Sequence, residues 1–474
     1  MEDFLNTQFK RLFARSFYKN LRLSLAEMSF LKDFVTTERG DPYPLLEHSE
    51  DREETVAYNT YTLHRGRVQR FFCRFFPYAT YEVTADRTGG AVGFTFALPE
   101  ATAFVTVADG LLRYRCGERV EERELPDFAR SSETFMVSCR PGAFDVYFRY
   151  RDKAEFFCTI EEDGFRYAHR EASFTNGHAA LYAEGRVTVK AVSAYLDNGV
   201  SIADMRPIRY ENGEIMTEGG KVYITASIRM QAGMLQGIFS WVPGTAEFAL
   251  TGALFYDSGD GLWCGDVAAS VLYHRGEREW YLWVCSFSHD HILGHAAFAG
   301  DPRFGVNVVD ITLMEKAPDG AEISSFLGFS GDEDPDFFYD EQKGRWLMAI
   351  CRVDPAIHGY RYLFFASERP FDGYQFIGRG LDGCETGGSF VRINGEIYFI
   401  CGNDFAKVSD YRIYHKDGMT TAAFDHPDGG FRGWGTVMPL RLGSRTRYFW
   451  LTFDRHGGSD YTWSYGNLYG FEAP

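Results

Sequence analysis

Residues 330–350, SGDEDPDFFYDEQKGRWLMAI, combine a turn, a short apolar strand, a second turn and an aromatic strand. The stretch opens with four carboxylates in seven positions: Asp332, Glu333, Asp334 and Asp336. Gly and charged residues between two apolar runs are typical of a β-hairpin. Whether this layout, in which acids precede an apolar strand, is repeated along the chain therefore decides which fold is predicted.

The same layout occurs five times after residue 197, each time as a polar entry, a small or apolar strand, a turn and an aromatic strand. The five segments are ADMRPIRYENGEIMTEGGKVYITASIR, GDVAASVLYHRGEREWYLWVCSF, EDPDFFYDEQKGRWLMAICRV, ETGGSFVRINGEIYFICGND and GWGTVMPLRLGSRTRYFWLTFDR. Their entry points, 204, 266, 334, 385 and 434, are 62, 68, 51 and 49 residues apart. This spacing suits one four-stranded blade per unit. A five-bladed β-propeller is predicted over 198–474.

The region before the repeats predicts two further parts. Residues 50–197 contain short alternating strands with the pattern of a β-sandwich, and their last run, HAALYAEGRVTVKAVSAYLD, resembles the closing strands of concanavalin-like sandwiches. Residues 1–49 form an N-terminal segment. Apolar residues near helical spacing between 3 and 35 predict a short amphipathic helical segment there. The expected fold class is all-β.

Composition limits the partners. The 474 residues carry 49 Lys and Arg against 66 Asp and Glu, a net charge of −17, without a basic cluster. Nucleic acid and anionic membranes are therefore not expected as partners. The nine cysteines are scattered without a Cys-x-x-Cys pair, so neither a disulfide framework nor a zinc site is indicated. The amino terminus lacks a secretory pattern, and a cytoplasmic protein is expected.

The in-phase acids suggest the chemistry. Asp204, Asp266, Asp334 and Glu385 stand at the entries of four repeats, where the inner strands of a propeller face a shared axis. Carboxyl groups held together in a partly desolvated place shift one another's pKa, so that one keeps its proton while another stays ionised. Glycosidic bond cleavage requires such a pair. We expect Trp263 and Trp434 to stack on sugar faces.

These residues resemble a known group of enzymes. DEDPDFFYDEQKGRWLMAI is similar to the third-blade segment of glycoside hydrolase families 43 and 32, and CETGGSFVRINGEIYFI is similar to their fourth-blade segment. WCGDVAASVLY resembles a second-blade segment of family 43. The resemblance covers residues 198–474. The order of the predicted domains differs from these families, because the sandwich here precedes the propeller. The chain is therefore also consistent with a distinct related family.

The resemblance implies roles for three carboxylates. Glu385 would be the general acid, Asp334 would orient it and set its pKa, and Asp204 would be the base or nucleophile. Asp266 is an alternative for this last role and is otherwise a substrate-binding candidate. Asp332, Glu333 and Asp336 are expected to be solvated loop charges.

Histidine and arginine side chains complete the candidate site. His289, His291 and His295 have the spacing H-x-H-x3-H. On a strand followed by a loop, the three imidazoles need not come together, so no metal is predicted. His289 and His291 are expected to bind substrate. Arg229, Arg352 and Arg455 lie at ends of repeat strands, where each would bind sugar hydroxyls or form an ion pair.

The sequence therefore predicts a cofactor-free glycoside hydrolase that removes a terminal sugar, of furanoside, pentoside or fructoside type, from small oligosaccharides. The oligomeric state is left open, with a homo-oligomer among the options. Three alternatives remain: a non-catalytic carbohydrate-binding propeller, a phosphorylase, and a uronate lyase that uses His and Tyr as base and Arg as clamp.

Overall fold

The structure, a computed structural model, describes residues 4–16, 19–29, 41–231, 233–314, 318, 325–326, 329–354, 356–357, 359–381, 385–403, 411–422, 431–454 and 467–474. It divides into two compact units. Unit 1 comprises Met1–Leu21, Asn198–Asp260 and Cys264–Pro474, and unit 2 comprises Arg22–Asp197 and Gly261–Trp263. The division after Asp197 lies where the propeller was expected to begin.

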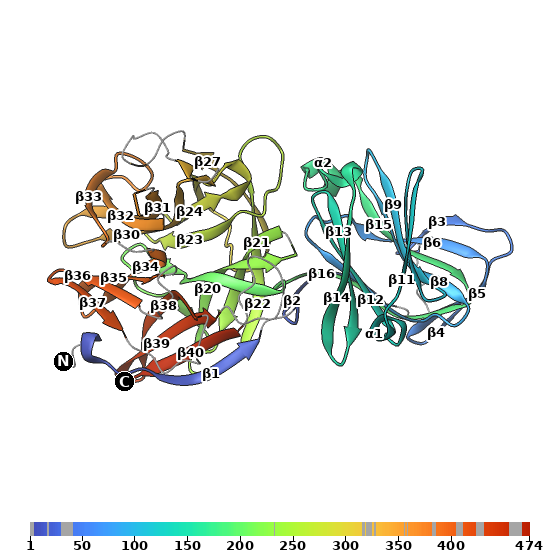
Figure 1. Cartoon of the computed structure of the whole chain (residues 1–474), viewed down its shortest axis with the longest axis horizontal. Coiled ribbons are helices and arrows are strands. Elements are labelled where there is room, and N and C mark those ends of the chain that lie inside the picture. Colours follow the sequence, from blue (N-terminus) through green and yellow to red (C-terminus); the bar gives the residue numbers. More distant parts are fainter. Residues whose placement is uncertain are drawn as a thin grey trace. The chain divides into compact units, whose positions relative to one another are not determined.

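Unit 1 is a five-bladed β-propeller, which confirms the predicted fold (Figure 1). Blade 1 contains β17 (Ser201–Pro207), β19 (Thr217–Glu218), β20 (Lys221–Met230), β21 (Gly233–Trp241), β22 (Phe248–Asp257) and β26 (Gly305–Asp310). Blade 2 contains β18 (Arg209–Tyr210), β23 (Val267–His274), β24 (Glu279–Ser286), β25 (Ile292–Phe298) and β27 (Thr312–Leu313), and the 3-10 turn η3 (Phe287–His289) joins β24 to β25.

The next two blades have four strands each, joined by antiparallel pairing. Blade 3 contains β30 (Asp332–Asp340), β31 (Arg345–Asp354), β32 (Gly359–Ser367) and β33 (Gln375–Arg379), preceded by the small hairpin β28 (Ser325–Phe326) and β29 (Phe329–Ser330). Blade 4 contains β34 (Glu385–Ile393), β35 (Glu396–Asn403), β36 (Tyr411–His415) and β37 (Gly418–Ala422). Asn394 and Gly395, both with positive φ, make the two-residue turn between β34 and β35 that an Asn-Gly pair favours.

Blade 5 joins the two ends of the chain. It contains β38 (Phe431–Leu442), β39 (Arg445–Asp454), β40 (Asn467–Ala473) and, as its outermost strand, β1 (Lys10–Ser16). The first strands of successive blades contact one another in the order β17, β23, β30, β34 and β38, and β38 contacts β17 again. The five innermost strands therefore surround one axis.

The N-terminal helix expected over residues 3–35 is wrong for the described residues. A single 3-10 turn, η1 (Phe4–Asn6), precedes β1, and residues 22–28 form strand β2 (Arg22–Met28) of unit 2. Phe4 and Phe9 are buried against aromatic rings of blades 4 and 5, such as Trp450, which lies 5.4 Å from Phe9 between ring centroids. Pairing with β40 and this packing override a helical spacing of apolar residues, because a short helix gains little without its own packed face.

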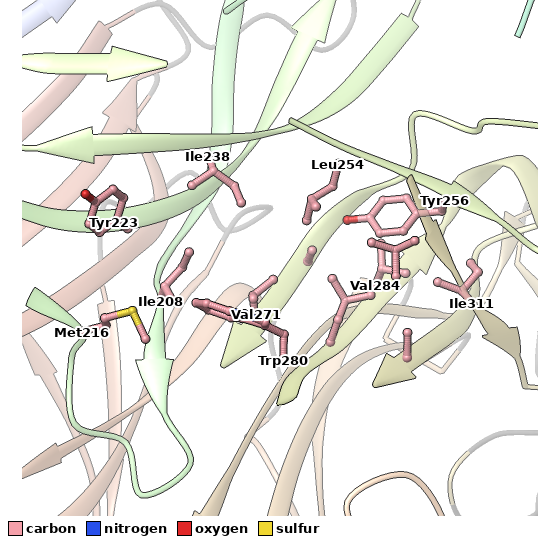
Figure 2. Close-up of a cluster of buried hydrophobic side chains, with 14 residues drawn as sticks. Ile208, Met216, Tyr223, Ile238, Leu254, Tyr256, Val271, Trp280, Val284 and Ile311 are labelled. Carbon is pink, nitrogen blue, oxygen red and sulfur yellow. The ribbon is translucent and has the colours of Figure 1, made fainter. Parts of the chain in front are cut away.

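Apolar packing holds the blades together. Between blades 1 and 2, fourteen buried side chains form one cluster, shown in Figure 2. Tyr223, Ile238 and Leu254 come from blade 1, and Val271 and Trp280 come from blade 2. Alternation along each strand places one face of every blade against its neighbour, so burial of these faces fixes the polar inner ends of the strands around the axis.

Unit 2 consists of two antiparallel sheets that pack on each other. One contains β3 (Leu45–His48), β6 (Arg67–Arg74), β8 (Gly90–Ala97), β9 (Thr102–Ala108), β10 (Leu111–Cys116), β11 (Arg119–Glu124) and β15 (His178–Gly185). The other contains β2, β4 (Glu53–Ala57), β5 (Thr60–Arg65), β7 (Thr80–Asp86), β12 (Thr134–Arg140), β13 (Ala143–Tyr150), β14 (Lys153–Glu161) and β16 (Val187–Asp197). Contacts such as Tyr81 with Phe96 and Phe96 with Phe144 join the two sheets.

Helices are few and short in unit 2. They are α1 (Asp127–Arg130), the 3-10 turn η2 (Asp163–Phe165) and α2 (Glu171–Asn176). No helix in the described part of the chain is long and apolar enough to cross a membrane.

Candidate active site

A bulge near the start of each innermost strand organises the axis of the propeller. The pairing register shifts after Ala203, Val267, Glu333, Thr386 and Arg432, the corresponding positions of the five blades. In four blades the next residue has a left-handed backbone: Asp204 (φ 51°), Ala268 (59°), Asp334 (49°) and Gly387 (59°). A bulge re-aims side chains, and a left-handed Asp or Ala is strained.

The positions of the bulges show that the four acids at the starts of the repeats are not all equivalent. Asp204 and Asp334 occupy the same bulge position in blades 1 and 3, as the repeats predicted. Asp266 and Glu385 lie two residues before that position, which Ala268 and Gly387 hold in their blades. The four acids predicted to be equivalent therefore belong to two layers, because the bulge cannot be placed from strand periodicity.

Asp204 and Asp334 are both buried, and their charges act on each other. Burial and then the charge of Asp204 raise the pKa of Asp334 to about 7, although Arg206 and the Gly387 N–H, 3.1 Å from Oδ2, act in the opposite direction. Asp204 Oδ2 accepts a hydrogen bond of 3.3 Å from Arg229. Among the described residues, the buried Asp204 Oδ1 has no hydrogen-bond partner. A carboxylate oxygen without a partner beside a carboxyl group of raised pKa is typical of functional sites, so this pair is the candidate reacting group.

Arg206 connects this pair to other blades. Its buried guanidinium donates to the carbonyl oxygens of Ala268 at 3.1 Å and Gly388 at 3.3 Å. The charges of Asp334 and other acids raise the pKa of Arg206 despite its burial. Arg206 therefore places one positive charge among the axial acids. This charge favours the ionised form of a neighbouring carboxyl group, so fewer of these acids need to stay protonated.

Glu333, the residue before Asp334, lies in a second cluster with His291 and Tyr360. Its Oε1 is 2.7 Å from His291 Nδ1 and accepts a 3.3 Å hydrogen bond from the Tyr360 hydroxyl. Its charge also contributes to the raised pKa of Asp334. Glu333 is therefore part of the axial group of acids and is only partly buried, with 14% of its side chain exposed.

Asp332 and Asp336 were expected to be solvated loop charges, and this is wrong. Both are buried on β30. Arg352 donates to both oxygens of Asp332, at 2.6 and 2.9 Å. Asp336 accepts hydrogen bonds from Arg209, from the Ser270 hydroxyl at 2.6 Å and from the Phe390 N–H at 2.6 Å. A buried carboxylate must be paired. The partners of Asp336 tie blade 3 to blades 2 and 4, whereas Arg352 pairs with Asp332 within blade 3. Of the two options for Arg352, the ion pair is present.

Glu385, the predicted general acid, is fully buried. Its Oε1 accepts hydrogen bonds from Arg412, at 2.9 Å, and from the Tyr414 hydroxyl, and its Oε2 accepts one from the Tyr362 N–H at 3.2 Å. Gly380 approaches so closely that a Cβ there would overlap with Oε2. A general acid must reach the leaving oxygen. Both oxygens of Glu385 are already engaged within the protein.

Asp266 and His289 form a separate hydrogen-bonded group. Ser286 and Ser288 hydroxyls donate to Asp266 Oδ2 at 2.7 and 2.9 Å, and the Ser288 N–H donates to Oδ1. Burial raises the pKa of Asp266, and these hydrogen bonds oppose the increase. His289 Nδ1 lies 2.9 Å from the Ser286 hydroxyl.

The remaining candidates are dispersed. His295 packs against Trp283 and Phe371, and its pKa is lowered by burial, so the three histidines have three different environments. Trp263 belongs to unit 2, where it packs against Phe76 and Phe174. The side chain of Trp434 and all of Arg455 lie outside the described residues.

Sequence reasoning missed Glu333, Tyr360 and Arg206 as members of the axial group. Asp204, Asp334 and Gly387 are residue types that tolerate positive φ. Their distances along the chain to the next strand of the blade differ, so the sequence alone did not indicate the bulges.

No family model and no curated protein matches the chain. Among solved structures, a GH62 hydrolase in complex with xylotriose aligns with a TM-score of 0.40 and 13% identity over 58% of this chain and 91% of that one. An α-L-arabinofuranosidase from Podospora anserina in complex with cellotriose aligns with a TM-score of 0.38 and 14% identity over 58% of this chain and 90% of that one. A thermostable family-43 glycoside hydrolase gives 0.36 and 12% over 58% and 89%.

The class defined by the sheets themselves is a five-bladed β-propeller with buried acids at its axis. In this architecture the chain is similar to the glycoside hydrolases of families 43 and 62.

Proposed function

We propose that the propeller is a glycoside hydrolase whose reacting carboxyl groups are Asp334 and Asp204. The observation that carries the proposal is the pKa of Asp334, raised to about 7 beside a second carboxyl group with an unpartnered oxygen. A carboxyl group that keeps its proton near neutral pH, next to a carboxylate paired with Arg229, supplies the acid and the base that glycoside hydrolysis needs.

In this mechanism Asp334 donates its proton to the glycosidic oxygen as the bond to the anomeric carbon breaks. A water molecule adds its oxygen to that carbon, and Asp204 takes up the proton that the water releases. The acid role predicted for Glu385 thus moves to Asp334. The substrate we propose is a small oligosaccharide with a terminal furanoside, pentoside or fructoside residue.

The test measures sugar release by the full chain from a panel of 4-nitrophenyl furanosides and pyranosides, short oligosaccharides and fructosides. Asp334→Asn should lower kcat/KM for unactivated substrates by about 100-fold or more, the usual contribution of general acid catalysis. Asp310→Asn, at an exposed position on β26, serves as the control. If the wild-type chain releases no sugar from any substrate, the proposal is refuted.

A uronate lyase is the second candidate, and one observation favours it. His291 and Tyr360, residue types that such enzymes use for proton transfer, both contact Glu333. A lyase would produce an unsaturated sugar without consuming water. Ultraviolet absorption of the product from a polyuronate, absent with neutral glycosides, would distinguish it from the hydrolase.

A further inference from the structure

Glu333 is held from one side only. His291, which follows η3, and Tyr360, on β32, both contact its Oε1. Among the described residues, nothing forms a hydrogen bond with its second oxygen, Oε2. Asp332, Asp336 and Glu385 differ from it, because each has partners at both oxygens within the chain.

The backbone that presents His291 is strained. Asp290 and His291 are consecutive residues with left-handed conformations, φ 53° and 60°, and the His291 N–H donates to the Ser286 carbonyl oxygen at 2.9 Å. The Phe287 ring lies 4.1 Å from the imidazole between centroids. Two adjacent left-handed residues that are not glycine cost free energy, and such strain persists where the surroundings fix a side chain for a purpose.

We propose that Glu333 is a sugar-binding residue of the axial site, held through Oε1 by His291 and Tyr360 so that Oε2 accepts hydrogen bonds from the hydroxyls of a neutral sugar. The inference rests on the proposed function, since it places the ligand beside Asp334. An ionised carboxylate only accepts hydrogen bonds, and adjacent sugar hydroxyls are donors. His291 and Tyr360 are positioning residues in this arrangement.

Binding is measured in the full-length Asp334→Asn protein, so that the readout does not depend on turnover. The probes are methyl xylopyranoside, methyl arabinofuranoside and methyl fructofuranoside, titrated by calorimetry. Histidine-labelled protein, with the His291 signal assigned from His291→Asn, reports by NMR whether the sugar reaches the cluster. Glu396→Gln is the matched control, because Glu396 forms an exposed surface pair with Lys416.

At least one probe should bind and shift the His291 signal. Adding Glu333→Gln should weaken that binding by about 10-fold to 100-fold, as expected for losing a charged acceptor. Tyr360→Phe should weaken it less, and Glu396→Gln should leave it unchanged. In the otherwise wild-type chain, Glu333→Gln should raise KM, and because the charge of Glu333 also raises the pKa of Asp334, it should move the alkaline limb of the kcat profile to lower pH. A purely structural role would not produce this combination.

Equal affinity with and without Glu333→Gln, or no binding of any probe, would overturn the inference. If a probe binds through Glu333 but the wild-type chain hydrolyses nothing, the inference stands and the proposed hydrolysis fails. If hydrolysis occurs and Glu333→Gln leaves KM unchanged, the hydrolase stands and the role of Glu333 is refuted.

Discussion

Asp334 shows how one residue position combines burial, charge and backbone geometry. Its backbone at the bulge is left-handed, and burial together with the charge of Asp204 in blade 1 lets its carboxyl group retain a proton up to about pH 7. The sequence predicted that Asp334 would raise the pKa of Glu385. The structure instead assigns the raised pKa to Asp334 itself.

The first prediction concerns the stability that Asp334 contributes at different pH values. Because its pKa is higher in the folded chain than in the unfolded chain, folding is favoured at low pH, and this contribution is lost as the pH rises from about 4 through about 7. One such group changes the free energy of unfolding by at most about 1.4 kcal/mol per pH unit. Urea unfolding between pH 5 and 8 should show a steeper loss for wild type than for Asp334→Asn. Parallel curves would contradict the raised pKa.

The second prediction separates a structural from a catalytic role for Glu385. Glu385→Gln removes the buried carboxylate charge that pairs with the Arg412 guanidinium, which should lower the free energy of unfolding by about 3 kcal/mol. The measurement is chemical unfolding, with Glu396→Gln, at an exposed pair, as control. A variant with unchanged stability and abolished turnover would instead restore Glu385 as the general acid.

At the scale of elements, β1 closes blade 5 with a strand from the other end of the chain. Phe9, just before β1, is buried against Trp450, whereas Leu12 on β1 is 39% exposed. Phe9→Ala should lower the free energy of unfolding by about 3 kcal/mol, since it leaves a cavity in an aromatic cluster. Leu12→Ala should change it by less than about 0.5 kcal/mol. Similar values for both variants, measured by urea unfolding, would show that closure does not depend on this packing.

Strand elements were predictable where local patterns and packing agree. The repeated layout of an apolar strand, a turn and an aromatic strand predicted the blades, because alternation and turn chemistry act locally. The role of residues 10–16 as a fifth-blade strand was not predictable. Their partner, β40, is more than 450 residues away, and no local pattern records it.

The candidate site was predicted in part for a related reason. Asp204 and Asp334 were found because they recur in phase, but the strand bulges moved Asp266 and Glu385 out of that phase. The partners of Glu333 come from the turn after η3 and from β32, neighbours that only the closed ring brings together. Contacts between distant segments therefore decided which acids are paired within the chain.

For the whole molecule, the net charge of −17 bears on the substrate. An acidic protein repels anionic ligands at long range and has no such effect on neutral ones. The repulsion extends about 30 Å at 0.01 M salt and about 8 Å at 0.15 M. Salt dependence of turnover therefore reports the charge of the true substrate.

For a neutral glycoside, kcat/KM should stay within about twofold as sodium chloride rises from about 0.01 to 0.5 M, because screening removes no interaction that the substrate makes. For an anionic uronide, any turnover should increase over the same range as repulsion is screened. Initial rates with a matched xyloside and glucuronide of one leaving group provide the comparison. A steep fall with salt for the best substrate would mean that it is attracted by a basic site. Among the described axial residues, Arg206 and Arg229 are already paired with carbonyl oxygens or with Asp204, so such a fall would contradict a neutral sugar as the ligand of this propeller.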